Sequence, residues 1–363
     1  MQNTQISPRN LFSLVILFEL GSSLVVAHGL AAQQHVWLAI VVGLISGLLF
    51  FLLYSYFYKK YPQDSLSTIT QKIMGKVLGR LINLLYIIYF LYIASLVFRD
   101  FTELFTTTLF QEHPSLAIQV PMLLVLMFAV FLGVVALARV SQLIALLYLF
   151  VILFILFVVG YMYFDLMHLF PQFEQGWVES VIATMPEVIT FPFGEMIVFT
   201  VFFQYVVKLD QGLKWIWIGI LVSGFLILLS STVIYGILGE ASLQETYPFV
   251  SMAKMVGNQF IFSLDPFLIV VLFIGGFIKT ALFLYASTTM MQEMVPIPKS
   301  ITIAIGAGLL LAASNLLSES YMEHIAKGLK LTSLYMDLPF QIGIPLLLFF
   351  VSIVRGFVKP QKA

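Results

Sequence analysis

The chain has 363 residues, of which 61% are hydrophobic and only 10% are charged. Soluble domains carry about 25% charged residues, so a chain this apolar cannot be a soluble globular domain. Unbroken apolar runs also exclude an outer-membrane barrel, whose strands alternate polar and apolar residues. The net charge of zero indicates no nucleic-acid partner, and the lack of cysteine excludes disulfides, thiolate metal sites and cysteine nucleophiles.

The apolar runs predict an all-α integral membrane protein, because a span needs about 20 mostly apolar residues. We interpret the first run as a retained span, since no convincing small-residue cleavage site follows it. Asp265-Pro266 is a typical helix start. Ten transmembrane helices are expected, at 9–31, 36–58, 81–110, 116–135, 139–162, 184–206, 213–237, 265–292, 299–317 and 338–357.

The basic residues support this count through the positive-inside rule. With both termini cytoplasmic, only three basic residues face outward: Lys254, Lys327 and Lys330. Two more, Arg99 and Lys279, fall within spans. The remaining basic residues fall inside: Arg9, Lys59, Lys60, Lys72, Lys76, Arg80, Arg139, Lys208, Lys214, Lys299, Arg355, Lys359 and Lys362.

The two halves of the chain indicate an inverted repeat. A polar insert at 59–80 precedes the third span, and another at 238–264 precedes the eighth, on the opposite face of the membrane. These two spans are the longest, which implies tilt. We therefore expect one transmembrane domain with a first five-helix repeat at 1–162 and an inverted repeat at 184–357, the pattern of many secondary transporters. Chance similarity of loop lengths is the alternative.

In such folds the first span of each half is broken near the midplane, where substrate binds. The first span has Gly21, Ser22 and Ser23 near its middle, and the sixth has Pro192 and Gly194. Proline removes a backbone donor, and glycine tolerates unwound conformations. The alternative is that the small residues serve close helix packing and that the proline only kinks its span.

Three motifs carry a resemblance to a known family. They are an opening of the form IS…LF…FELGSSLVV…G, then Trp37-Leu38-Ala39, and FPFGE at 191–195. Together they resemble the B-type permease subunit of spore germination receptors, within the amino acid–polyamine–organocation transporter superfamily. The resemblance covers nearly the whole chain. It implies a subunit of the spore inner membrane that recognises a nutrient, commonly an amino acid, beside an A-type membrane subunit and a C-type lipoprotein.

Ionisable residues at membrane depth are functional candidates, because their burial is costly. Glu19 precedes the first predicted break and Glu195 follows the second, while Lys279 lies within the eighth span. We expect Lys279 to pair with one of the two glutamates, and such a lysine can replace a bound sodium ion. A purely structural pair, or capping of the broken helix by Glu195, is the alternative.

The third span carries a second group of charges. Arg99 and Glu103 are spaced i,i+4, so they share a helix face and can pair, and Asp100 adjoins them. Residues near the end of a span also snorkel to the interface without any further role. Both interpretations remain open from the sequence.

A ligand site is expected at the two breaks. A helix N-terminus exposed there favours a carboxylate, and the freed carbonyls of the other half-helix favour an ammonium, which suits a small zwitterion. Aromatic rings would close over an apolar side chain, and a threonine beside Lys279 adds a polar group. The predicted ligand-binding residues are Gly21, Ser22, Ser23, Phe98, Phe191, Phe193, Gly194 and Thr280.

The sequence thus predicts a nutrient-sensing membrane subunit that binds a small amino acid and signals to partner subunits within the lipid bilayer. The alternatives are a proton- or cation-coupled amino acid transporter and a structural partner that binds no ligand. The five histidines have no metal-binding spacing, and no phosphate loop, nucleophile elbow or dinucleotide motif is present. No enzyme activity, metal or cofactor is expected.

Overall fold

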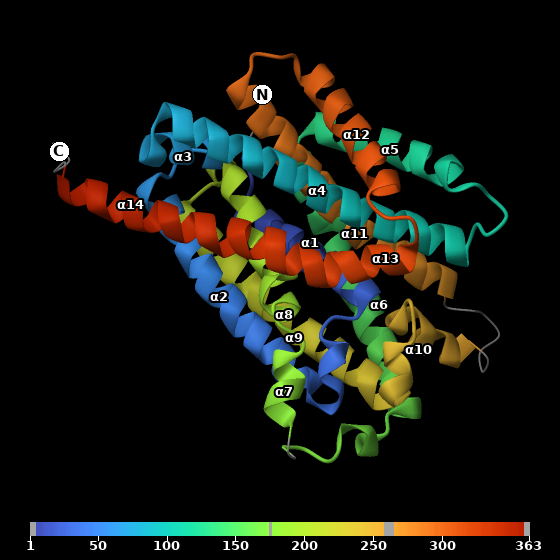
Figure 1. Ribbon diagram of the computed structural model, residues 1–363. Helices are drawn as coiled ribbons and strands as arrows, with labels where there is room; N and C mark the ends of the chain where they lie inside the picture. Colours follow the sequence, from blue (N-terminus) through green and yellow to red (C-terminus); the bar gives the residue numbers. More distant parts are fainter. Residues whose placement is uncertain (1–4, 174–175, 258–264, 359–363) are drawn as a thin grey trace.

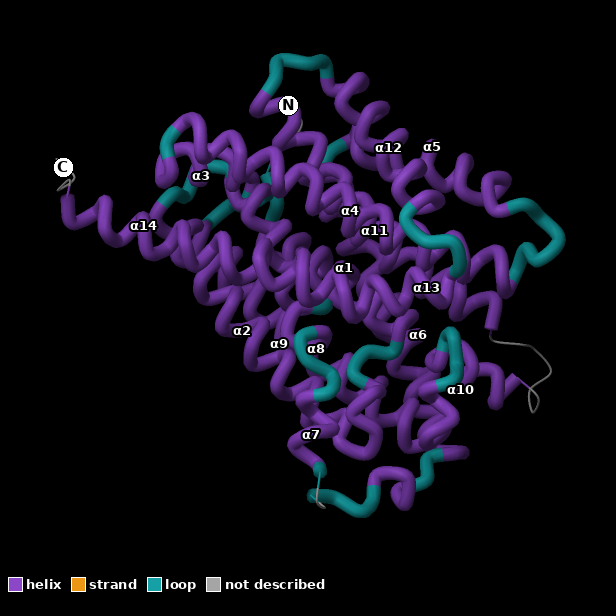
Figure 2. Tube along the Cα trace, viewed as in Figure 1, coloured by secondary structure: helices purple, strands orange, loops and turns teal. Residues whose placement is uncertain are grey.

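A computed structural model describes residues 5–173, 176–257 and 265–358, and all regular secondary structure in these ranges is helical (Figure 2). The helices are α1 (Pro8–Val26), η1 (Leu30–His35), α2 (Val36–Lys60), α3 (Leu66–Met74), α4 (Lys76–Thr108), α5 (Ser115–Leu132), α6 (Val134–Tyr163), η2 (Leu166–Leu169), α7 (Trp177–Ile182), α8 (Glu187–Thr190), η3 (Phe193–Val201), η4 (Phe203–Tyr205), α9 (Leu209–Leu238), η5 (Gly239–Leu243), α10 (Pro248–Gly257), α11 (Asp265–Met294), α12 (Lys299–Leu316), α13 (Tyr321–Ala326), η6 (Lys327–Gly343) and α14 (Ile344–Val358).

Nine helices in the described ranges are long and apolar enough to cross a membrane, and they correspond to nine of the ten predicted spans. A helix satisfies its own backbone groups, which a lipid environment demands. The remaining span, at 184–206, is present in the pieces α8, η3 and η4, each too short to cross alone. The prediction of an all-α membrane protein with about ten spans is therefore confirmed.

The sixth span breaks where FPFGE predicts. The helix α8 ends at Thr190, Phe191 has an extended backbone (φ −108°, ψ 132°), and η3 begins after Pro192. Proline has no N–H to donate to the preceding turn, which favours a kink or break at this position. Phe191 therefore lies at the gap between two short helices.

The predicted position of the first break is wrong. Helix α1 runs unbroken through Gly21 to Ser23 and ends at Val26, and the chain then turns through left-handed residues at Ala27 (φ 52°) and Gly29 (φ 76°). Ser23 does not open the helix, because its hydroxyl donates within the helix to the carbonyl of Glu19 (2.6 Å). The first span is therefore broken near its end instead of at its middle.

Gly21 marks a close helix crossing. A Cβ atom at Gly21 would lie 2.6 Å from the carbonyl carbon and oxygen of Gly275 in α11. The two backbones thus touch directly, the small-residue packing common in membranes. All residues of α1 from Ser13 to Val25 are buried, so this helix lies inside the bundle.

The order of elements is the same in both halves of the chain. The first half contains α1, α2, α4, α5 and α6, and the second contains the broken sixth span, α9, α11, α12 and the last helix. The short helix α3 precedes α4, and the short helix α10 precedes α11. In Figure 1 α3 lies at the end of the bundle near the C-terminus, and α10 lies at the opposite end. This arrangement is the five-plus-five inverted repeat that the sequence predicts.

The last helix begins earlier than predicted. The sequence predicts a span at 338–357, whereas α13, η6 and α14 form one continuous helical segment from Tyr321 to Val358, with π-helical hydrogen bonding in η6. Its first half looks too polar for a span because Thr332, Asp337 and Gln341 are buried against other helices instead of facing lipid. A hydropathy pattern assigns such polar residues to a loop, because it does not register that they are buried against other helices.

Candidate functional site

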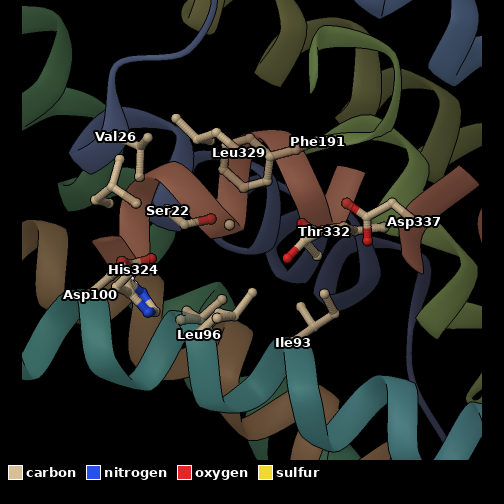
Figure 3. A pocket seen from close by; sticks show the side chains of 14 residues that line it. Ser22, Val26, Ile93, Leu96, Asp100, Phe191, His324, Leu329, Thr332 and Asp337 are labelled. Carbon is tan, nitrogen blue, oxygen red and sulfur yellow. Dashed lines mark hydrogen bonds and ion pairs between the residues drawn. The ribbon is translucent and has the colours of Figure 1, made fainter. Parts of the chain in front are cut away.

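A cavity of about 50 Å³ lies between α1, α4, the break of the sixth span and the last helix (Figure 3). A single water needs roughly 10–15 Å³ by this measure, so the cavity has room for only a few small groups. Its walls are formed by Ser22, Val26, Ile93, Leu96, Val97, Asp100, Phe191, Glu195, His324, Ile325, Gly328, Leu329, Thr332 and Asp337. The wall thus combines six polar or charged side chains with a larger apolar surface, at the core of a membrane protein.

Lys279 connects three spans beside this cavity. Its ammonium forms an ion pair with Glu195 of η3 and donates to the hydroxyl of Ser22 in α1 (2.7 Å). It also lies over two aromatic rings, 5.0 Å from the centroid of Phe18 and 4.6 Å from that of Phe191. The expected pairing of Lys279 with a glutamate is therefore present, and the partner is Glu195.

Glu19, the other candidate, is fully buried one helical turn before Ser22. Neither of its carboxyl oxygens has a hydrogen-bond partner among the residues that the structure describes. A buried polar group without a partner is uncommon in native proteins and points to an ion, a water or a functional role.

One pole of the cavity contains a carboxylate–imidazole pair. The Oδ1 atom of Asp100 in α4 lies 3.0 Å from Nε2 of His324 in α13 and accepts a longer hydrogen bond from the Tyr321 hydroxyl (3.4 Å). Figure 3 shows Asp100 and His324 facing each other across the cavity wall. Both side chains are buried, so this pair joins α13 to α4 at the end of the bundle that contains α10.

The opposite pole is lined by η6. The hydroxyl of Tyr89 donates to Oδ1 of Asp337 (2.8 Å), and the amide of Gln341 donates to the Tyr89 oxygen (2.9 Å). Thr332 shares a hydrogen bond with the Tyr92 hydroxyl (2.7 Å). A row of tyrosines in α4 thus positions the polar face of the last helix.

Of the predicted ligand-binding residues, Ser22 and Phe191 line the cavity, together with the predicted charged residue Glu195. Phe98 and Thr280 line a separate cavity of about 10 Å³ near α5. Phe193 packs against Gly47 of α2 and does not line the cavity. The remaining three predicted residues do not line it either: Gly21, Ser23 and Gly194.

The predicted pair of Arg99 and Glu103 is not formed among the described residues. Arg99 instead donates through Nη1 to the carbonyls of Ser314 (3.1 Å) and Ser318 (2.7 Å). These carbonyls lie at the end of α12, where backbone acceptors lack helical partners and attract a cation. Arg99 therefore caps a neighbouring helix.

Sequence reasoning missed the contribution of the last helix to the cavity. The residues that it overlooked are His324, Gly328, Thr332 and Asp337. Their spacing is four, four and five residues, so an α-helical period does not place Asp337 on the face of the other three, and only the π-helical turns of η6 bring them together.

The chain matches the sequence profile of a family described as "Spore germination protein" over residues 5–321. This chain belongs to the spore germination protein family. It is 31% identical over 360 residues to Spore germination protein KB of Bacillus subtilis (strain 168), covering 97% of this chain and 96% of that protein. Spore germination protein YndE of the same organism is 25% identical over 108 residues, 30% of each chain.

Among solved structures, the family member resembles Mhp1, a nucleobase-cation-symport-1 family transporter, in a closed conformation with bromovinylhydantoin bound. The TM-score is 0.66 at 12% identity, covering 99% of this chain and 94% of Mhp1. The inward-facing conformation of Mhp1 gives a TM-score of 0.52 at 12% identity, with 99% and 92% covered. The chain is therefore a non-enzymatic integral membrane protein of a germination family with a transporter fold.

Proposed function

We propose that this chain is the nutrient-sensing subunit of a spore germination receptor and that a small amino acid binds in the cavity between α1, α4, the broken sixth span and the last helix. The observation that carries the proposal is the cavity at Phe191, the break of the sixth span, whose wall combines charged, polar and apolar side chains. Membership of a germination family supplies the physiological setting.

The cavity walls suit the functional groups of an amino acid. The carboxyl groups in the wall can accept hydrogen bonds from an ammonium. The hydroxyl of Ser22 offers a hydrogen bond, and Phe191 and Leu329 contribute apolar surface. The small volume limits the ligand to the size of glycine or alanine unless the walls move.

Ligand binding would act through the helices that meet at the cavity. A ligand shifts a conformational equilibrium only by its difference in affinity between the states. Contacts to Phe191 and Leu329 join the broken span to the last helix, so a ligand that bridges them stabilises the closed arrangement. Partner subunits, an A-type membrane subunit and a C-type lipoprotein, would read this change in the spore inner membrane, with both termini of the chain cytoplasmic.

Binding and uptake, measured on the same preparation, test this function. Each common L-amino acid is added to the purified full-length chain in detergent, and the midpoint of thermal unfolding is measured. Sensing predicts stabilisation by one or a few small amino acids, and no uptake of the same labelled amino acid into liposomes that contain only this chain. No stabilisation by any amino acid would contradict the proposal and favour a structural partner.

A cation-coupled amino acid transporter is the second candidate, because the fold is that of a transporter. The buried and unpaired carboxyl group of Glu19 also lies beside the Lys279–Glu195 pair, where a cation can neutralise it. Uptake into liposomes that depends on a proton or sodium gradient would favour this function over sensing.

A further inference from the structure

The ionisable groups at the cavity are not balanced in charge. Three carboxyl groups line it, and two of them have a basic partner: Glu195 pairs with Lys279, and Asp100 contacts His324. The third, Asp337, forms no ion pair with any basic residue in the part of the chain that the structure describes. Its hydrogen-bond partners are neutral hydroxyl groups, those of Tyr89 and Thr190.

An ionised carboxylate in this position is stabilised by a positive charge beside it. Asp337 is 3% exposed and lies within a membrane-spanning segment, where burial of an uncompensated charge costs several kcal/mol. We infer that Asp337 recognises the ammonium group of the ligand and that the cavity therefore selects small molecules with a primary ammonium. The inference rests on the proposed function and adds the residue that determines ligand class.

The π-helical geometry of η6 places a second ligand group beside this carboxylate. Asp337 follows Thr332 by five residues, and an α-helix would point residues five apart in different directions. The wider turns of a helix closed by i→i+5 bonds bring them to the same side. Both line the cavity, and Figure 3 shows them next to each other. An ammonium has three donors, so it can bind the carboxylate and the threonine oxygen together.

The rest of the cavity explains why the ammonium would bind at this pole. Glu195 already pairs with Lys279, which repels a second cation, and Asp100 already has His324 as a hydrogen-bond partner. The wall between the poles is apolar and includes Ile93 and Leu96 of α4. A ligand with its ammonium at Asp337 would place its carbon atoms along this wall.

Isothermal titration of the purified full-length chain with three probes tests the inference. The probes are L-alanine, ethylamine, which lacks the carboxylate, and propionate, which lacks the ammonium. The key variant is Asp337→Asn, because asparagine retains the oxygen that accepts the Tyr89 hydrogen bond and loses only the charge. Asp165→Asn is the matched control, since Asp165 is exposed and caps η2 outside the cavity.

We expect the unmodified chain to bind alanine and ethylamine, with propionate much weaker. Asp337→Asn should weaken the binding of alanine and of ethylamine by about 10- to 100-fold, which is the effect of losing a hydrogen bond to a charged group. Asp165→Asn should leave the binding of all three probes unchanged. Tyr89→Phe keeps the charge of Asp337 and removes the hydrogen bond that Tyr89 donates to it, so this variant should still bind alanine. The comparison separates the loss of charge from a structural defect.

Two results overturn the inference in different ways. If Asp337→Asn binds alanine as tightly as the unmodified chain, or if propionate binds as well as ethylamine, Asp337 does not recognise an ammonium and the proposed function still stands. If the unmodified chain binds neither L-alanine nor any other common L-amino acid, the proposed function fails and the inference fails with it.

Discussion

The ammonium of Lys279 in α11 forms an ion pair with the carboxylate of Glu195 in η3, and both side chains are almost completely buried. Lys279 also donates to Ser22 in α1, so one cation connects the first, sixth and eighth spans. Because Ser22 comes from the first half of the chain and the ion pair from the second, the contact joins the two repeats at the core. It lies next to the cavity, which Glu195 and Ser22 both line.

Replacement of Lys279 by methionine should destabilise the chain strongly. Removal of one partner of a buried ion pair leaves an uncompensated charge and costs about 3–5 kcal/mol. We expect a large fall in the thermal unfolding midpoint in detergent, with partial recovery in the double variant Lys279→Met/Glu195→Gln, which removes both charges.

The control for this pair is Lys72→Met, which breaks an ion pair with Asp64 in which the lysine side chain is 52% exposed. Such surface pairs contribute about 0–1 kcal/mol, so this variant should unfold close to the unmodified chain. Equal stability of Lys279→Met and Lys72→Met would show that the buried pair has no structural role.

The close crossing of α1 and α11 predicts intolerance of larger side chains at Gly21. A leucine there would overlap the backbone of Gly275, which cannot move aside as a side chain can. Overpacking of a core typically costs about 1–3 kcal/mol, and a backbone clash should reach or exceed the upper figure. Gly308→Leu in α12 is the matched control, because no atom lies within 4 Å of the added Cβ. If the yield of folded protein is the same for both variants, the packing is looser than described.

The Asp100–His324 contact predicts a coupling energy between α4 and α13. A double-mutant cycle with Asp100→Asn and His324→Gln, read from denaturant unfolding in detergent, should give a coupling of about 1–3 kcal/mol. The exposed pair of Lys327 and Glu323 on the same helical segment should give a much smaller coupling, because solvent screens it. A coupling for Asp100 and His324 as small as that of the exposed pair would exclude a contribution of this contact to closure of the cavity.

Much of the fold was predictable because membrane insertion imposes strong constraints on sequence. Apolar length defines the spans, and the distribution of lysine and arginine gives an orientation that remains a prediction. The break at Phe191 was predictable because Pro192 lacks the N–H that would continue the helix and is followed by Gly194, although Pro121 and Pro339 lie within helices.

The errors share one physical cause, which is that tertiary contacts determine what a polar or small residue does. Gly21 and Ser23 have the composition of a helix break, yet Gly21 packs on α11 and the hydroxyl of Ser23 bonds within α1. Asp337 and Thr332 have the composition of a loop, yet they are the buried face of a span. Arg99 was expected to pair with a side chain four residues away and instead caps α12.

Filling the cavity is the most direct test of the central claim that a small amino acid binds there. Gly328 lines the cavity and no atom lies within 4 Å of an added Cβ, so Gly328→Leu occupies the space without a clash of that Cβ. The measurement is saturable binding of labelled L-alanine to the purified chain, compared with Gly308→Leu outside the cavity. The account predicts binding to the unmodified chain and to Gly308→Leu but none to Gly328→Leu; unchanged binding to Gly328→Leu would contradict it.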